Sequence, residues 1–254
     1  MVRAKQSVLA TGGCGRVYRE TTNPASVTGD GVAMAFRAGA SLQDMEFIQF
    51  HPTTLYVAGA SRALISESLR GEGGVLRNRS GERFMARYHP DAELAPRDVV
   101  SRSIVEEMRQ TEHTHVYLDA TAMSSEYLEN RFPTITALCR RFGLDPAQDM
   151  IPVRPAAHYM IGGVRTDLLA RTDVKNLFAV GEVACTGLHG ANRLGSNSLV
   201  EGLVFGRRCA EEAARKLREM PERLSLHALQ ALPQEPSYGR LNLTDVANSL
   251  KSVM

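Results

Sequence analysis

Five side chains that could bind anions stand beside glycine- or proline-containing turns of this 254-residue chain. They are Arg70 in LRGEGG, Arg97 in LAPRDVV, Arg193 in GANRLGSNS, His51 in QFHPTT and His158 in AAHYMIGG. Guanidinium groups fix carboxylates through paired hydrogen bonds, and a neutral imidazole donates another. Taken singly, each residue is better explained as a solvated loop residue or a structural histidine. Their shared setting favours a site for a small dianion.

No metal site is predicted. The stretch HTH at 113–115 lacks a third ligand and has no glycine neighbours. The cysteines at 14, 139, 185 and 209 lie far apart in sequence and form no C-x-x-C pair. This usage is typical of a reduced, cytoplasmic protein without a structural metal.

Charge and composition exclude two classes of partner. The net charge is +2, with 43% hydrophobic and 23% charged residues, which is ordinary for a globular protein. Nothing in this balance points to nucleic acid or to a membrane surface. No apolar run approaches the roughly 18 residues that a membrane span needs. We therefore expect neither nucleic acid nor a membrane as a partner.

The elements that position these residues begin with the stretch HGANRLGSNSLVEGLVFG at 189–206. It changes from polar and glycine-rich to apolar, which predicts a loop followed by a buried helix. Ser198 and Glu201 have the spacing of a capping box, so the helix is expected to begin near Ser198 and end near Leu217. The first turn of a helix carries unpaired N–H groups and partial positive charge. An electron-rich ligand would suit this end of the helix.

The rest of the chain is expected to be α/β at both ends, with an inserted middle of α+β character. SVLATGGCG predicts a buried strand at 7–10 that needs a parallel neighbour from elsewhere in the chain. Apolar spacing predicts helices at 29–40, 96–110 and 124–142 and an amphipathic helix at the C-terminal end. HVYLDAT and NLFAVGEVA are typical of strands.

Six motifs in a fixed order carry a resemblance to a known family. They are FHPT, RGEGGVLRNRSGERF, APRDVVSR, AAHYMIGGVRTD, NLFAVGEVA and HGANRLGSNSL. In this order they resemble the flavoprotein family of L-aspartate oxidase, fumarate reductase and succinate dehydrogenase. The resemblance runs from about Val8 to Gly206 and more loosely into the tail.

Within this family the chain is similar to the aspartate oxidases. PAAHY (155–159), ELAPRD (93–98), VYLDAT (116–121) and AVGEVACTGLHGANR (179–193) carry that likeness. The respiratory enzymes tend to have Thr at the position of Ala156 or Ala157. The likeness implies oxidation of L-aspartate to iminoaspartate, the first step of NAD biosynthesis, by non-covalent FAD that accepts a hydride at N5. Fumarate and succinate would be related ligands, oxygen or fumarate the electron acceptor, and quinolinate synthase a candidate partner.

The resemblance also implies roles for individual residues. Arg97 matches the arginine that exchanges a proton with substrate. A free guanidinium is a poor base, so Arg97 needs a partner, for which Glu67 is a candidate. His51, His158 and Arg193 match dicarboxylate-binding residues, and Ser66 with Glu67 matches a Thr-Glu pair that holds substrate. The positions around the flavin are Asp30, Glu182, Ser198 and Leu199.

The implied fold is a partial Rossmann-like FAD-binding domain at 1–44 and 161–222, interrupted by an α+β capping domain at 45–160. The start of a helical C-terminal region follows at 223–254. The strand–GxGxxG–helix unit that binds the ADP half of FAD is not recognised, because GGCGRV at 12–17 has the wrong spacing. We therefore expect a fragment that binds FAD weakly and is inactive alone. The alternatives are a fumarate reductase or succinate dehydrogenase subunit, or a non-catalytic dicarboxylate-binding chain.

Overall fold

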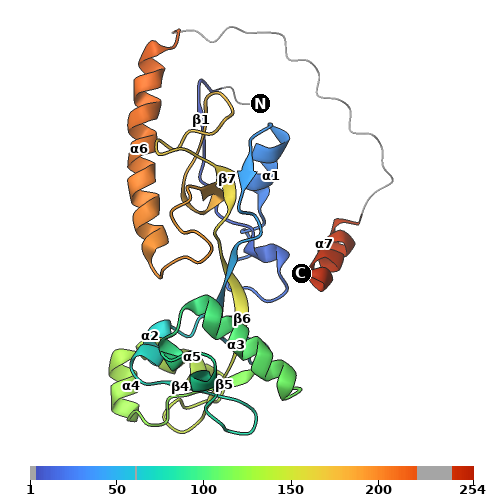
Figure 1. Ribbon diagram of the computed structural model, residues 1–254, viewed down its shortest axis with the longest axis vertical. Coiled ribbons are helices and arrows are strands. Elements are labelled where there is room, and N and C mark those ends of the chain that lie inside the picture. The colour runs from blue at the N-terminus through green and yellow to red at the C-terminus, as the bar shows by residue number, and fades with distance from the viewer. Residues whose placement is uncertain (1–3, 61, 222–241) are drawn as a thin grey trace. The chain divides into compact units, whose positions relative to one another are not determined.

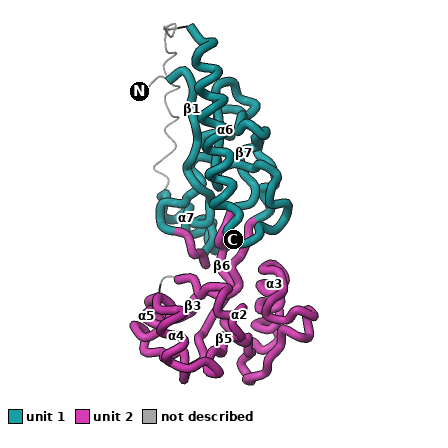
Figure 2. The backbone as a smooth tube through the Cα atoms, turned by 90° about the vertical axis from the view of Figure 1, so that its left-hand side faces the viewer, with its two compact units in different colours: residues 1–19, 24–47, 160–254 teal, residues 20–23, 48–159 magenta. Residues whose placement is uncertain are grey.

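The computed structural model describes residues 4–60, 62–221 and 242–254, and the chain divides into two compact units (Figures 1 and 2). Unit 1 comprises 1–19, 24–47 and 160–254, and unit 2 comprises 20–23 and 48–159. Most of the predicted C-terminal region, 223–241, lies outside the described residues.

A parallel pair of strands opens unit 1. β1 (Ser7–Leu9) pairs with β8 (Leu177–Ala179), and Val8 lies opposite Phe178. NLFAVGEVA thus supplies the parallel neighbour that the sequence required. The prediction of a buried strand was wrong, because Val8 is 49% exposed. Among the described residues β8 is the one strand paired with β1, and this leaves the Val8 side chain open to solvent.

A second sheet of unit 1 depends on a close backbone approach. β7 (Gly163–Arg165) lies between β2 (Leu42–Gln43), to which it is antiparallel, and β9 (Ala184–Cys185), to which it is parallel. A Cβ added to Gly162 would lie 2.1 Å from the carbonyl oxygen of Asp44. Gly162, directly before β7, therefore lets two backbone segments approach closely.

The helices of unit 1 are α1 (Asp30–Arg37), α6 (Asn197–Glu219) and α7 (Leu243–Val253), with single turns η1 (Gly15–Val17) and η4 (Gly181–Val183). The predicted burial of α6 was wrong for much of its surface. Glu201, Phe205 and Cys209 form a buried stripe at helical spacing, and Phe205 and Cys209 pack with Phe178. Leu199 and Leu203 are exposed. In the described part of the chain no helix combines the length and apolarity that crossing a bilayer requires.

The capping box at the start of α6 was also predicted wrongly. The N-cap is Ser196, with a φ of 67° and no side-chain capping bond. The Oγ atom of Ser198 accepts from Arg193 Nη1 at 3.2 Å instead. The Glu201 carboxylate accepts from Thr186 Oγ1, and its Oε2 lies 2.8 Å from His189 Nε2. Partners from the preceding loop have replaced the local capping bonds.

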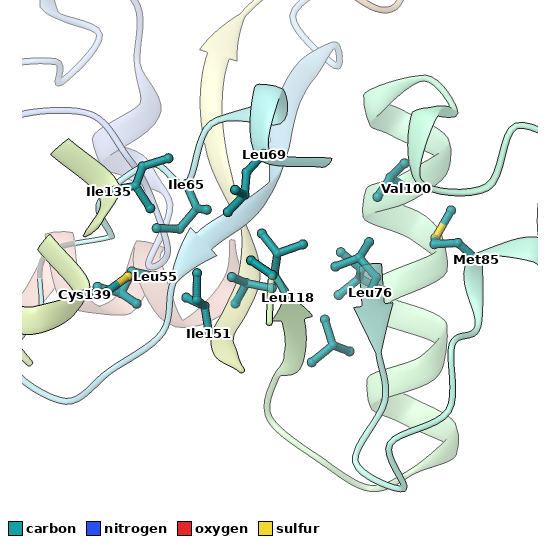
Figure 3. Packing of buried hydrophobic residues seen from close by; sticks show 14 of the residues in the cluster. Leu55, Ile65, Leu69, Leu76, Met85, Val100, Leu118, Ile135, Cys139 and Ile151 are labelled. Carbon is teal, nitrogen blue, oxygen red and sulfur yellow. The ribbon is translucent and has the colours of Figure 1, made fainter. Parts of the chain in front are cut away.

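Unit 2 is built on a four-stranded sheet in the order β3 (Ile48–Leu55), β6 (Ile151–Met160), β5 (Val116–Asp119), β4 (Val75–Arg77). β5 is antiparallel to both of its neighbours. Figure 3 shows the core of this unit, in which Leu55, Leu76 and Ile151 are fully buried. Complete burial of such a side chain contributes about 1.5–3 kcal/mol to folding.

The helices of unit 2 are α2 (Glu67–Gly71), α3 (Arg97–Gln110), α4 (Ser125–Arg131) and α5 (Pro133–Arg141), with single turns η2 (Met85–Arg87) and η3 (Ala92–Leu94). The helix predicted at 96–110 is confirmed by α3. The helix predicted at 124–142 is two helices, which meet at Phe132 and Pro133. Proline disfavours helical geometry in the residue before it, and Phe132 has φ −130° and ψ 50°.

Candidate functional site

Arg97 is the centre of a polar cluster in unit 2. It is the first residue of α3, directly after Pro96, and its side chain is mostly buried. Its Nε and Nη2 atoms each lie 2.8 Å from Glu67 Oε2, and Nη1 donates to Gln49 Oε1 at 3.2 Å. The guanidinium is therefore fixed along two edges by a carboxylate and an amide.

Gln49 was not singled out from the sequence. It is buried in β3, two residues before His51. Side chains two apart on a strand project from the same face, so this spacing could have linked Gln49 to the predicted histidine.

His51 is a neutral imidazole with one buried donor. Its side chain is fully buried, and Nδ1 accepts the Thr53 N–H at 3.3 Å. Burial holds the pKa of His51 well below its usual value, and the positive charges of Arg97, His158 and Arg70 lower that pKa further. The one proton therefore sits on Nε2, which has no hydrogen-bond partner among the described residues. An unpaired buried donor costs about 1–3 kcal/mol, so the site is suited to a ligand that accepts a hydrogen bond here.

His158 lies next to His51. The two rings meet edge to face, with centroids 5.4 Å apart. His158 belongs to β6, and its Nδ1 is 2.8 Å from Thr22 Oγ1. Asn23 Nδ2 donates to the carbonyl of His158 at 3.1 Å. The short segment 20–23, remote in sequence, thus fixes this imidazole within unit 2.

Ser66, Glu67 and Arg70 come from α2 and the residue before it. The Ser66 hydroxyl accepts the Ser68 N–H at 3.2 Å and so caps this helix. Arg70 is buried, its Nη2 lies 3.8 Å from Glu67 Oε1, and burial lowers its pKa. Glu67 therefore lies between two guanidinium groups. Two cations against one carboxylate leave an excess of positive charge, which suits a dianion.

The remaining predicted residues belong to unit 1. Arg193 is buried and donates to Ser198 at the start of α6. Burial raises the pKa of Glu182, and the Met160 N–H, 2.9 Å from its Oε1, and the charge of Arg193 lower it. Asp30 lies in the first turn of α1, and Leu199 is exposed in the first turn of α6. The structure thus links Arg193 with Ser198 and Glu182.

The start of α6 has no side-chain cap. The aligned peptide dipoles of this 23-residue helix place partial positive charge at Asn197. Leu194 and Leu199, close to this end in sequence, are exposed. An electron-rich group would suit this end of the helix.

A protein family whose members share an FAD binding domain matches residues 1–199. L-aspartate oxidase of Streptomyces coelicolor is 54% identical over 216 residues, which are 84% of this chain and 37% of that protein. L-aspartate oxidase of Bacillus subtilis is 53% identical over 213 residues, covering 84% of this chain and 39% of the relative. The chain spans about two fifths of the length of these relatives.

Two solved structures resemble the fold. Quinol fumarate reductase of E. coli superimposes with a TM-score of 0.79 at 45% identity, over 85% of this chain and 40% of that one. Sdh1 of Mycobacterium smegmatis superimposes with a TM-score of 0.78 at 38% identity, over 99% of this chain and 44% of that one. The match over 1–199 and the identity to the relatives show the family. The chain belongs to the FAD-binding-domain family, and its cofactor is FAD.

Proposed function

We propose that this chain is part of an L-aspartate oxidase that converts L-aspartate to iminoaspartate with FAD. The S. coelicolor and B. subtilis proteins of this name are 54% and 53% identical to it. The observation that carries the proposal is the cluster in unit 2, where Arg97 is fixed by Glu67 and His51 offers a buried, unpartnered Nε2–H. A C4 dicarboxylate supplies the acceptor and the charge that this cluster lacks.

The roles of the side chains follow from their chemistry. His51 and His158 donate to one carboxylate, and Arg193 binds a carboxylate through its guanidinium. Fixing a carboxylate restricts the orientation of the substrate's Cα–H bond, an effect worth several kcal/mol. When bound, FAD supplies the hydride acceptor. Arg97 exchanges a proton with substrate, and Glu67 at 2.8 Å balances its charge.

The domain assignment is part of the proposal. Residues 1–44 and 161–222 would form the Rossmann-like FAD-binding part and residues 45–160 the capping part. Asp30, Glu182, Ser198 and Leu199 would contact the flavin. Ser66 would hold substrate beside Glu67, with its hydroxyl also capping α2. The segment α7 would begin the helical C-terminal region.

A second candidate is a flavoprotein subunit of fumarate reductase or succinate dehydrogenase. The similarity to the E. coli and M. smegmatis structures favours it, at 45% and 38% identity. The higher identity to the aspartate oxidases favours the first candidate. In either case fumarate and succinate would bind at the same cluster. For the L-aspartate oxidase candidate, we further propose oxygen or fumarate as the oxidant and quinolinate synthase as a partner.

A chimera distinguishes the two candidates. Residues 8–206 would replace the matching segment of the B. subtilis relative, and the purified protein would be supplied with FAD. We expect reduction of the flavin by L-aspartate, followed by its absorbance, and no reduction by succinate. Reduction by succinate alone would favour the second candidate. A folded chimera that binds FAD and is reduced by neither substrate would contradict both.

A further inference from the structure

A buried acidic residue outside the predicted site contacts it indirectly. Glu93 lies in η3, and its side chain is 5% exposed. The preceding residue, Ala92, has a φ of 46°, a region that L-residues rarely adopt. A buried carboxylate is retained only where charges or hydrogen bonds compensate its lost hydration. The neighbours of Glu93 supply both.

Its carboxylate accepts three hydrogen bonds. Arg83 donates from Nε to Oε1 at 3.0 Å and from Nη2 to Oε2 at 2.6 Å. The Leu76 N–H donates to Oε1 at 3.2 Å. A two-pronged ion pair of this kind fixes orientation as well as charge. Arg83 is 52% exposed, so Glu93 is held from the surface side of unit 2.

The backbone of Glu93 contacts Arg70, one of the residues of the polar cluster around Arg97. Its backbone carbonyl accepts from Arg70 Nη1. Arg70 Nη2 lies 3.8 Å from Glu67 Oε1, and Glu67 Oε2 is 2.8 Å from the Arg97 guanidinium. Charges thus alternate from Arg83 at the surface to Arg97. The two inner guanidinium groups would repel each other without this anchoring.

We propose that Glu93, clamped by Arg83, is a positioning residue of the dicarboxylate site. It fixes the η3 carbonyl, this carbonyl fixes Arg70, and Arg70 with Glu67 sets the place of Arg97. The inference concerns the geometry of the cluster, and its relevance to catalysis rests on the proposed function. Glu93 itself does not touch substrate.

The pKa of His51, measured by NMR on the chain labelled with ¹⁵N-histidine, reports on this geometry. Arg97 and Arg70 both lower that pKa by their proximity. Releasing the clamp with Glu93→Gln lets the guanidinium groups move away from the ring. We expect the pKa of His51 to rise by about half a pH unit or more.

The direction of the change in the pKa of His51 shows whether the cations have moved or whether only a charge has been lost. Loss of one negative charge would by itself lower the pKa of a histidine, so a rise in Glu93→Gln requires movement of the cations. Arg83→Gln breaks the same clamp at the surface and should also raise the pKa. Because loss of a cation raises a histidine pKa by itself, this rise is judged against Arg87→Gln, which removes an equally exposed cation. If Glu93→Gln does not fold, Arg83→Gln decides the question.

The chain offers a matched control. Arg87 is 51% exposed, and its Nη2 lies 2.5 Å from Glu107, which is 1% exposed. This pair has the burial pattern of Arg83 and Glu93, but Glu107 accepts from Arg87, Tyr88 and Asn78 and is not bonded to Arg70. Arg87→Gln should leave the pKa of His51 unchanged. An unchanged pKa in folded Arg83→Gln, or an equal rise in Arg87→Gln, would overturn the proposal. Because no substrate is added, this result is independent of whether the proposed function holds.

Discussion

The two units place their predicted site residues in different ways. In unit 2 charged and polar side chains meet directly, as Arg97 does with Glu67 and His51 with His158. In unit 1 the features that stand out belong to the backbone, namely the uncapped start of α6 and the close approach at Gly162. A small dianion is bound by side-chain charge, whereas a large flat cofactor also needs backbone donors and space. Each of the following changes tests one side of this contrast.

The largest effect is expected at Arg97, in unit 2. Lysine keeps the charge but cannot contact both Glu67 and Gln49 with a rigid fork. In the FAD-loaded chimera Arg97→Lys should lower turnover of L-aspartate about 10²–10⁴-fold, the usual contribution of a positioned proton-transfer group. Steady-state kinetics measures this. Arg102→Lys is the control, because Arg102 is exposed on the same helix and pairs with Asp98. Near-normal turnover in Arg97→Lys would rule out the proton-transfer role.

The backbone approach in unit 1 is tested by Gly162→Ala. The added Cβ would lie 2.1 Å from the Asp44 carbonyl oxygen, so β2 and β7 must separate. We expect a loss of about 3 kcal/mol in the free energy of unfolding, measured in urea. Gly202→Ala is the control, since its Cβ meets nothing within 4 Å in α6, and alanine should add up to about 1 kcal/mol. Equal stabilities for the two variants would contradict a role for close packing here.

The buried imidazole of His51 should make the free energy of unfolding depend on pH. Its pKa is lowered in the folded state, so below the unfolded pKa, near 6.5, the unfolded chain binds the extra proton. The stability due to His51 is therefore complete above that pH and falls on acidification, by about 1.4 kcal/mol per pH unit, until the folded pKa is reached. His51→Gln should flatten this slope between about pH 6.5 and 5.5. Urea unfolding at several pH values measures it, and an identical slope in both proteins would refute the assignment.

The smallest effect is expected at Ser66. Ser66→Ala removes the bond from the Ser68 N–H, which caps α2, and should cost about 0.5–1 kcal/mol. Ser66→Thr keeps the hydroxyl and should change stability by less than about 0.5 kcal/mol. Thermal unfolding of both variants distinguishes them. A larger loss in threonine than in alanine would show that the methyl group does not fit.

Local signals predicted the elements of unit 2 better than the contacts between them. Pro96 marked the start of α3, and polar residues beside turns marked His51 and Arg97. Gln49 and Glu93 were missed because glutamine and glutamate are usually exposed. Only the folded chain shows that Gln49 and Glu93 are buried, with Arg97 and Arg83 as their partners.

In unit 1 the predictions were wrong where residues from other segments, and not sequence neighbours, determine the hydrogen bonds and the burial. The spacing of Ser198 and Glu201 indicated a capping box, but Thr186 and His189 take the carboxylate. The apolar run at 7–10 indicated a buried strand, but burial depends on how many strands flank it. Periodicity identifies an element and its apolar positions, and tertiary neighbours decide which of them are covered.

The most direct test of the dicarboxylate site is the Nε2–H signal of His51 during a succinate titration of the ¹⁵N-histidine-labelled chain. No FAD is added to the labelled chain, so succinate has no hydride acceptor and the result does not depend on turnover. We predict a saturable downfield shift of this proton as a carboxylate accepts its hydrogen bond, and no shift with acetate at the same concentration. A His51 signal that stays unchanged at saturating succinate would contradict the account.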